Sequence, residues 1–220
     1  MTTEPRVMRS GVLSLLVAAL VLLVGFWWLG VYVTKHGEPP ALWAFAQAVR
    51  GHGVWVAWAF TNAGWPAVLG PLYAASIAVA IFVRPWRVRA VYLVSVALVA
   101  WGCADAFQRL FARPRRLDWL IRHEHAFSYP SSHAAISTAF YFLAAVLLLR
   151  SELRPWIRYC SFAILIAMWL GILWSRLALA AHYPTDVIAG TCLGVALALL
   201  GAAFVRLTGG RLVAAPGRAP

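Results

Sequence analysis

Two histidines and one carboxylate stand out in a chain that is otherwise largely apolar. His133 ends the stretch YPSSH (residues 129–133), which leads directly into an apolar run. His182 lies four residues before Asp186, with Pro184 between them at the expected first position of a helix. This spacing allows the carboxylate to accept a hydrogen bond from one ring nitrogen, which fixes the tautomer and leaves the other nitrogen as a nucleophile.

Arginines, hydroxyl groups and prolines gather in three polar segments around these histidines. The segments are QRLFARPRR (residues 108–116), YPSSH (residues 129–133) and SRLALAAHYPTD (residues 175–186). Guanidinium groups match the oxygens of a phosphate, and the free N–H groups of a helix N-terminus bind anions. This set of residues suits a phosphate group better than a metal ion. We expect one histidine to attack phosphorus while the other protonates the leaving group.

The second segment has the features of a helix start. Pro130 fixes the entry of the chain, and Ser131 and Ser132 can cap the first amides or direct them toward an anion. His133 then falls in the first turn, near the positive end of the helix dipole. We expect this histidine to exchange a proton with the substrate.

The composition indicates a membrane protein. Hydrophobic residues make up 63% of the 220 residues and charged residues only 12%, whereas about one quarter of a soluble domain is charged. The net charge of +12 does not indicate nucleic acid, because the basic residues lie in short clusters between apolar runs. The cysteines lack metal-type spacing, so we expect buried free thiols at Cys103, Cys160 and Cys192.

The apolar runs predict an all-α integral membrane bundle of about six transmembrane helices. The expected spans are residues 11–33, 66–83, 91–111, 134–149, 156–179 and 185–205, with a short interfacial helix over residues 39–50 after the first. Asn62, Gly64 and Pro66 should break the long apolar stretch before the second span. We expect one domain over residues 1–207 and a flexible tail over residues 208–220.

The basic clusters predict how the bundle lies in the membrane. An even number of spans places both termini on one side, and most arginines then fall on that side: Arg6, Arg9, Arg84, Arg87, Arg89, Arg150, Arg154, Arg158, Arg206, Arg211 and Arg218. The positive-inside rule makes this side cytoplasmic, in a plasma (inner) membrane. A second cluster violates the rule on the other side: Arg109, Arg113, Arg115, Arg116 and Arg122. The violation requires a local reason, which a phosphate site would supply.

The three polar segments resemble the three signatures of the type 2 phosphatidic acid phosphatase superfamily, K-x6-R-P, P-S-G-H and S-R-x5-H-x3-D. The third segment matches throughout, and the second differs by Ser132 in place of glycine, as in relatives similar to dolichyl diphosphatase. The first departs more, because Gln108 stands at the lysine and Arg116 at the proline when Arg115 is aligned with the motif arginine. Gln108 and Arg115 would project from one face if the helix continued.

The resemblance implies a role for each matching residue. His182 would be the nucleophile that forms a phosphohistidine, Asp186 would orient it, and His133 would act as general acid and then as base. The implied phosphate ligands are Arg115, Arg176, Ser131 and Ser132, to which we add Gln108 and Arg113 from the first segment. No metal or cofactor is expected, because arginines can neutralise the developing charge.

The expected substrate is a lipid phosphate within the membrane, and the site is expected at the extracytoplasmic face. We favour undecaprenyl diphosphate, because the short loops leave little room for a large headgroup. The alternatives are a phospholipid or lipid A phosphatase, a phosphotransferase that uses the same site, and a non-catalytic lipid-binding relative. Neither the substrate nor the oligomeric state follows from the sequence.

Two further groups have competing interpretations. The HEH stretch at residues 123–125 resembles a pair of metal ligands, but no further thiolate or imidazole of suitable spacing lies nearby, so solvated or substrate-contacting residues are favoured. Asp105 lies within an expected span, where a carboxylate needs a partner, and Arg109 one turn later can form a structural ion pair with it.

Overall fold

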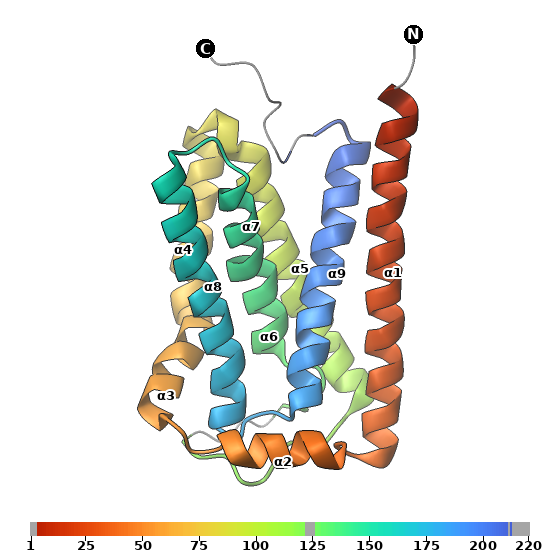
Figure 1. The fold of residues 1–220 in the computed structure, drawn as a ribbon, viewed down its shortest axis with the longest axis vertical. Helices are drawn as coiled ribbons and strands as arrows, with labels where there is room; N and C mark the ends of the chain where they lie inside the picture. Colours follow the sequence, from red (N-terminus) through yellow and green to blue (C-terminus); the bar gives the residue numbers. More distant parts are fainter. Residues whose placement is uncertain (1–3, 122–125, 211, 213–220) are drawn as a thin grey trace.

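A computed structural model describes residues 4–121, 126–210 and 212, and over this part of the chain the fold is all-α, without strands. Figure 1 shows a bundle of long, nearly parallel helices with one short helix lying across an end. The elements are α1 (Glu4–His36), α2 (Pro40–Val49), α3 (Val54–Ala63), α4 (Pro66–Phe82), η1 (Arg84–Trp86), α5 (Arg87–Phe111), α6 (Ser132–Ser137), η2 (Thr138–Phe142), α7 (Leu143–Leu149), α8 (Pro155–Ala178) and α9 (Pro184–Leu207).

The prediction of six spans is confirmed within the described residues. Six helical stretches there are long and apolar enough to cross a membrane: Gly11–His36, Val54–Phe82, Arg84–Phe111, Ser132–Leu149, Pro155–Ala178 and Pro184–Leu207. The second stretch consists of α3 and α4, separated at Gly64 and Trp65, as the expected break requires. Pro66 causes this break, because the residue before a proline is disfavoured in the helical conformation.

The short helix expected after the first span is present as α2. It joins α1 to α3 and lies across the end of the bundle opposite the start of α1 and the end of α9 (Figure 1). The basic clusters of the η1 turn and of the α7–α8 turn lie at the other end, with the start of α1. Arg122, Arg211 and Arg218 lie outside the described residues.

The fourth span is wider in its middle than an ordinary α-helix. Its chain runs through α6, a π-helical turn from Thr138 to Phe142, and α7. The indole Nε1 of Trp169 on α8 donates to Thr138 Oγ1 at 2.9 Å, beside this turn. Turns of this kind occur often near functional sites, and this one directly follows the helix that carries His133.

Two glycines allow α9 to lie against α6. A Cβ atom at Gly194 would lie 2.7 Å from the carbonyl oxygen of Ala135, and one at Gly190 would overlap the carbonyl oxygen of Ser131. The four-residue spacing of these glycines is typical of helices that pack closely in membranes. This contact brings the first turn of α9 against the first turn of α6.

The cysteines differ from the expectation. They are free thiols, but Cys160 is exposed and Cys103 and Cys192 are half-buried, so the expectation of buried thiols is wrong. Apolar thiols on a membrane helix can face lipid as readily as the interior. The expected flexible tail lies largely outside the described residues; α9 ends at Leu207, and the carbonyl of Leu212 accepts a hydrogen bond from Arg89 at 2.8 Å.

Candidate active site

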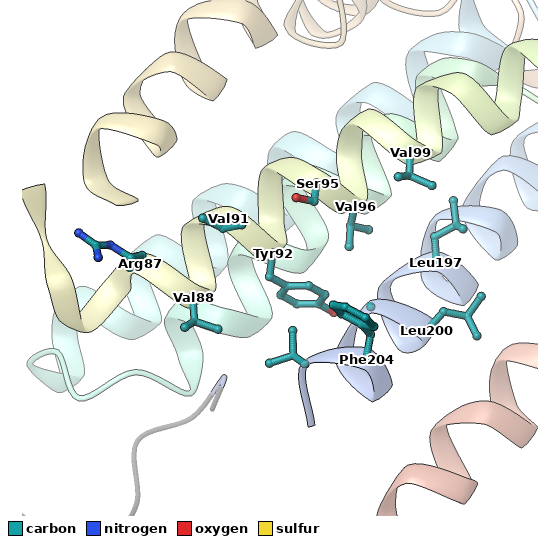
Figure 2. Close-up of a pocket in the computed structure, with 12 residues that line it drawn as sticks. Arg87, Val88, Val91, Tyr92, Ser95, Val96, Val99, Leu197, Leu200 and Phe204 are labelled. Carbon is teal, nitrogen blue, oxygen red and sulfur yellow. The ribbon is translucent and has the colours of Figure 1, made fainter. Parts of the chain in front are cut away.

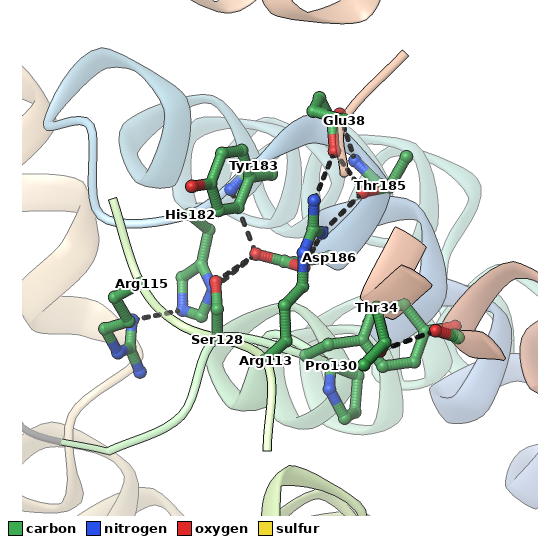
Figure 3. A network of polar contacts seen from close by, with 12 residues as sticks. Thr34, Glu38, Arg113, Arg115, Ser128, Pro130, His182, Tyr183, Thr185 and Asp186 are labelled. Carbon is green, nitrogen blue, oxygen red and sulfur yellow. Dashed lines mark hydrogen bonds and ion pairs between the residues drawn. The ribbon is translucent and has the colours of Figure 1, made fainter. Parts of the chain in front are cut away.

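The three polar segments meet at the end of the bundle that α2 covers. The first contains the last turn of α5 and the residues after it, the second opens α6, and the third joins α8 to α9. Ser131 N donates to the carbonyl of Asp186 at 3.0 Å, which links the second segment to the third. Ser128, directly before the second segment, donates its N–H to the carbonyl of Arg113 at 2.8 Å, which joins this part of the chain to the first segment. Figure 3 shows how the side chains of this cluster face one another.

The His182 ring is completely buried and is held at both nitrogens. Its Nδ1 lies 3.4 Å from Asp186 Oδ2, and its Nε2 lies 3.0 Å from Arg115 Nη1 (Figure 3). A carboxylate only accepts hydrogen bonds and a guanidinium only donates them. Nδ1 therefore carries the hydrogen, and the Nε2 lone pair points toward Arg115.

The surroundings of His182 keep its ring neutral. Burial lowers its pKa from 6.5 to about 4, and the positive charges of Arg115 and Arg176 act in the same direction. The hydrogen bond to Asp186 opposes this shift but does not cancel it. A neutral imidazole at neutral pH is the form able to act as a nucleophile.

Asp186 accepts hydrogen bonds from several groups besides His182. Its Oδ1 accepts from Arg113 Nη1 at 2.6 Å, and its Oδ2 accepts from Ser128 Oγ and from Tyr183 N at 3.0 Å. The last contact caps the N-terminus of α9, where a carboxylate is also favoured by the helix dipole. One side chain therefore both starts the helix and orients His182.

The arginine of the third segment, Arg176, is buried in the last turn of α8. Its Nη1 donates to Thr61 Oγ1 on α3, and its carbonyl oxygen accepts from His182 N at 3.2 Å and from Ala181 N at 3.0 Å. These backbone bonds close the chain back after α8, so that His182 lies beside the end of that helix. The half-helix α3, which the proline break separates from α4, thereby takes part in the site.

The second segment forms a helix start as expected. Ser131 Oγ accepts from Ala134 N at 3.3 Å, and Ser131 is the N-cap of α6. The His133 ring lies edge-on to Trp65, with ring centroids 6.0 Å apart. A Cβ atom at Gly64 would lie 2.7 Å from His133 Cδ2, so the turn between α3 and α4 is packed against this histidine.

Two expected phosphate ligands form hydrogen bonds with other groups of the protein. Gln108 is buried, and its Nε2 donates to the Pro130 carbonyl at 2.9 Å, so its amide supports the second segment. Arg113 is also buried, and its guanidinium contacts Asp186, Thr185 and Glu38. Both side chains therefore form hydrogen bonds within the protein, and their contact with a phosphate stays a prediction. α5 ends at Phe111 and Ala112 has a φ of +47°, so the helical register that linked Gln108 to Arg115 does not continue.

Glu38 and Ser128 were not among the predicted site residues. Glu38 lies between α1 and α2, and its carboxylate contacts Arg113 and Thr185 (Figure 3). A signal existed for Glu38, because it is an acidic residue between two apolar segments. No signal in the sequence distinguished Ser128 from its neighbours.

Further charged groups near this end form ion pairs. Arg116 donates to both oxygens of Asp118 at 2.9 and 2.7 Å, which lowers the pKa of that carboxyl group. The expected pair of Asp105 and Arg109 forms, at 3.0 Å, on an exposed surface. The HEH stretch lies outside the described residues. Among those described, His, Cys, Asp and Glu form no group of three or more that could hold a metal ion.

A large apolar groove lies away from this cluster. It has a volume of about 510 Å³ between α5 and α9, toward the end of the bundle where α9 finishes (Figure 2). Tyr92 and Phe204 line it, with Arg87 at its edge. None of the expected site residues borders this groove, so the polar cluster at the opposite end is the candidate active site.

Two comparisons with known proteins gave a match. The model of the PAP2 superfamily matches residues 89–208, which is more than half of the chain and includes all three polar segments. The fold is similar to the crystal structure of a transmembrane PAP2 type phosphatidylglycerolphosphate phosphatase from Bacillus subtilis, with a TM-score of 0.69 and 22% identity over 84% of this chain and 94% of that chain. A search of curated proteins gave no match. The chain therefore belongs to the PAP2 superfamily.

Proposed function

We propose that the protein is a membrane phosphatase that hydrolyses a terminal phosphate from a lipid phosphate or diphosphate through a phosphohistidine at His182. The observation that carries the proposal is the pair of contacts on the His182 ring, with Asp186 at Nδ1 and Arg115 at Nε2. They give a neutral ring whose lone pair lies beside a group able to hold phosphate oxygens. Membership of the PAP2 superfamily and the fold shared with a solved phosphatase support this activity.

In the first step, His182 Nε2 attacks phosphorus and forms the N–P bond while the bond from phosphorus to the leaving oxygen breaks. His133 donates a proton to that oxygen, so that the lipid leaves as an alcohol or a monophosphate. Asp186 accepts the hydrogen bond from Nδ1–H and stabilises the positive charge that develops on the ring.

In the second step, His133 takes a proton from water as the water oxygen attacks phosphorus. The N–P bond breaks, its electron pair returns to Nε2, and inorganic phosphate is released. Arg115 and Arg176, with Ser131 and Ser132, hold the non-bridging oxygens in both steps. Fixed cationic groups in a water-poor site stabilise the developing charge without rearrangement.

We favour a polyprenyl diphosphate such as undecaprenyl diphosphate as the substrate, because the connections at this end, apart from residues 112–131 between α5 and α6, are short. The positive-inside rule supports termini in the cytoplasm and a site at the extracytoplasmic face of the inner membrane. A phospholipid or lipid A phosphate fits the same chemistry with a larger headgroup. The solved PAP2 phosphatase of similar fold carries the name of a phospholipid phosphatase, which makes phosphatidylglycerol phosphate the first competitor to test.

The test is phosphate release by the purified protein in nanodiscs from a panel of undecaprenyl diphosphate, phosphatidylglycerol phosphate, phosphatidic acid and lipid A. We expect release from at least one lipid, and none from the same lipid with His182→Ala. Transfer of phosphate to a second lipid without free phosphate would identify a phosphotransferase. A folded protein that releases or transfers phosphate from no lipid in the panel would contradict the proposal and indicate a lipid-binding relative.

Metal independence belongs to the same proposal. We expect turnover to survive a chelator, because guanidinium groups take the role that Mg²⁺ has in other phosphoryl-transfer sites. Vanadate, which resembles five-coordinate phosphorus, should inhibit. Loss of activity that only added Zn²⁺ or Mg²⁺ restores would overturn this part and direct attention to the HEH stretch.

A further inference from the structure

Glu38 is a buried carboxylate that comes from outside the three polar segments. It lies in the short connection between α1 and α2, and only 3% of its side chain is exposed. A buried carboxylate is costly unless it is paired and hydrogen-bonded. Its partners therefore indicate what it does.

Those partners lie at the start of α9 and after the end of α5. Glu38 Oε1 accepts from Thr185 N at 3.1 Å, and Oε2 accepts from Thr185 Oγ1 and from Arg113 Nη2 at 2.9 Å. Thr185 is in the first turn of α9, where the helix dipole favours a negative charge. The connection after α1 is thus joined to the helix that carries Asp186.

Arg113 stands between two carboxylates. Its Nη2 contacts Glu38, and its Nη1 contacts Asp186 Oδ1 at 2.6 Å and Thr185 Oγ1 at 2.8 Å (Figure 3). The guanidinium also lies over the Tyr183 ring, 4.1 Å from its centroid. Both ends of the guanidinium fork and one of its faces are therefore in contact with the site.

This arrangement has an electrostatic consequence for Asp186. A single guanidinium paired with Asp186 alone would neutralise that carboxylate and weaken its attraction for a charged imidazole. Glu38 shares the positive charge, so the group of two carboxylates and one guanidinium keeps a net negative charge next to His182. It also fixes the guanidinium from the side opposite Asp186.

We propose that Glu38 is a positioning residue for the His182 nucleophile, acting through Arg113 and Thr185 to hold Asp186 against the ring. The expected effect on kcat rests on the proposed function, whereas the expected effect on the His182 tautomer does not. Glu38 touches neither His182 nor Asp186 in the contacts described, so its effect passes through the two intermediate side chains.

The kinetic test compares Glu38→Gln and Glu38→Asp with Glu152→Gln. Glutamine keeps the shape but loses the charge, and Glu152 is an exposed carboxylate in the α7–α8 turn at the other end of the bundle. We expect Glu38→Gln to lower kcat by about ten- to a hundredfold with little change in KM, by analogy with the groups that orient metal-bound histidines. Glu38→Asp should restore part of kcat, and Glu152→Gln should match the wild type.

A second test reads the position of the ring without turnover. ¹⁵N-histidine NMR of the full chain in nanodiscs, with His182→Gln to assign the signal, should show the Nδ1–H tautomer at His182 in the wild type and in Glu152→Gln. Glu38→Gln should show a mixture of tautomers. This spectrum decides the inference even where no lipid phosphate is hydrolysed, so failure of the proposed function and failure of this inference are separate results.

A Glu38→Gln protein with the wild-type tautomer at His182 would overturn the inference, as would a kcat equal to that of Glu152→Gln. A fall in kcat that only follows a smaller folded fraction, measured by size-exclusion chromatography and thermal unfolding, would also overturn it, because a merely structural role predicts that result.

Discussion

At the scale of single residues, the proposed mechanism depends on a histidine that stays neutral although charged groups surround it. Burial and the charges of Arg115 and Arg176 lower the pKa of His182 to about 4. In a ¹⁵N-histidine titration of the folded protein, we expect His182 to remain neutral between pH 6.5 and its lowered pKa, where an exposed histidine becomes protonated. An ordinary titration of His182 near 6.5 would show that the ring is not held as described.

Arg115 is the arginine whose removal should matter most at this scale. Arg115→Ala removes the group next to Nε2, so we expect kcat to fall by about a hundred- to a thousandfold, as for loss of one charge-stabilising donor. The pKa of His182 should rise, because a neighbouring positive charge is lost. Arg109→Ala is the matched control, since Arg109 forms an exposed pair with Asp105. Equal activities of the two variants would contradict the assignment.

The sequence predicted the residues of the site unevenly. The spacing of His182 and Asp186 was sufficient, because both lie at one helix start and four residues there span a hydrogen bond. The helical register that was expected to link Gln108 to Arg115 does not hold, because α5 ends at Phe111 and the left-handed Ala112 turns the chain. The buried position of Glu38 could not be predicted, since it depends on a tertiary contact between α1 and α9.

At the scale of elements, the site depends on the close approach of α9 to α6. Gly194→Ala would place a Cβ atom 2.7 Å from a backbone oxygen that cannot move alone. We expect the free energy of unfolding to fall by about 1–3 kcal/mol, the usual cost of overpacking, and the activity to fall with it. Thermal unfolding in detergent measures the effect. Gly102→Ala is the control, because its Cβ would meet no atom within 4 Å; equal stability of both variants would contradict the packing argument.

The sequence predicted where helices begin more often than it predicted which helices contact one another. Prolines at the first positions of α2, α4, α8 and α9 mark helix starts in the sequence as well as in the structure. The π-helical turn after α6 carries no such mark, because its residues Thr138 to Phe142 continue the apolar pattern. Local chemistry fixes where a helix begins, and packing decides how it runs.

At the scale of the whole molecule, the start of α1 and the end of α9 lie at the end opposite the site (Figure 1). With the site proposed at the extracytoplasmic face, both chain ends should be cytoplasmic. A fluorescent protein that matures only in the cytoplasm should therefore fluoresce when fused to the C-terminus, and a periplasm-dependent alkaline phosphatase should be inactive there. The reverse pattern would place the site in the cytoplasm.

Apolar run length was enough to predict the bundle, because a chain in lipid must satisfy its backbone within each helix. The meeting of the three polar segments at one end of the bundle could also be predicted from the sequence. Consecutive spans run in opposite directions, so every second connection lies at the same end. The covering of the site by α2 and α3 did not follow from the sequence, because neither helix carries a residue of the three segments.

The most direct test of the central claim is to trap the phosphoenzyme. The wild-type protein should be mixed with a ³²P-labelled lipid phosphate from the panel, quenched within one turnover, and digested for mass spectrometry. We expect a phosphoryl group that is labile in acid and stable in base, located on His182, and absent from a folded His182→Ala protein that also shows no turnover. Hydrolysis that persists in folded His182→Ala, or label on a different residue, would contradict the account.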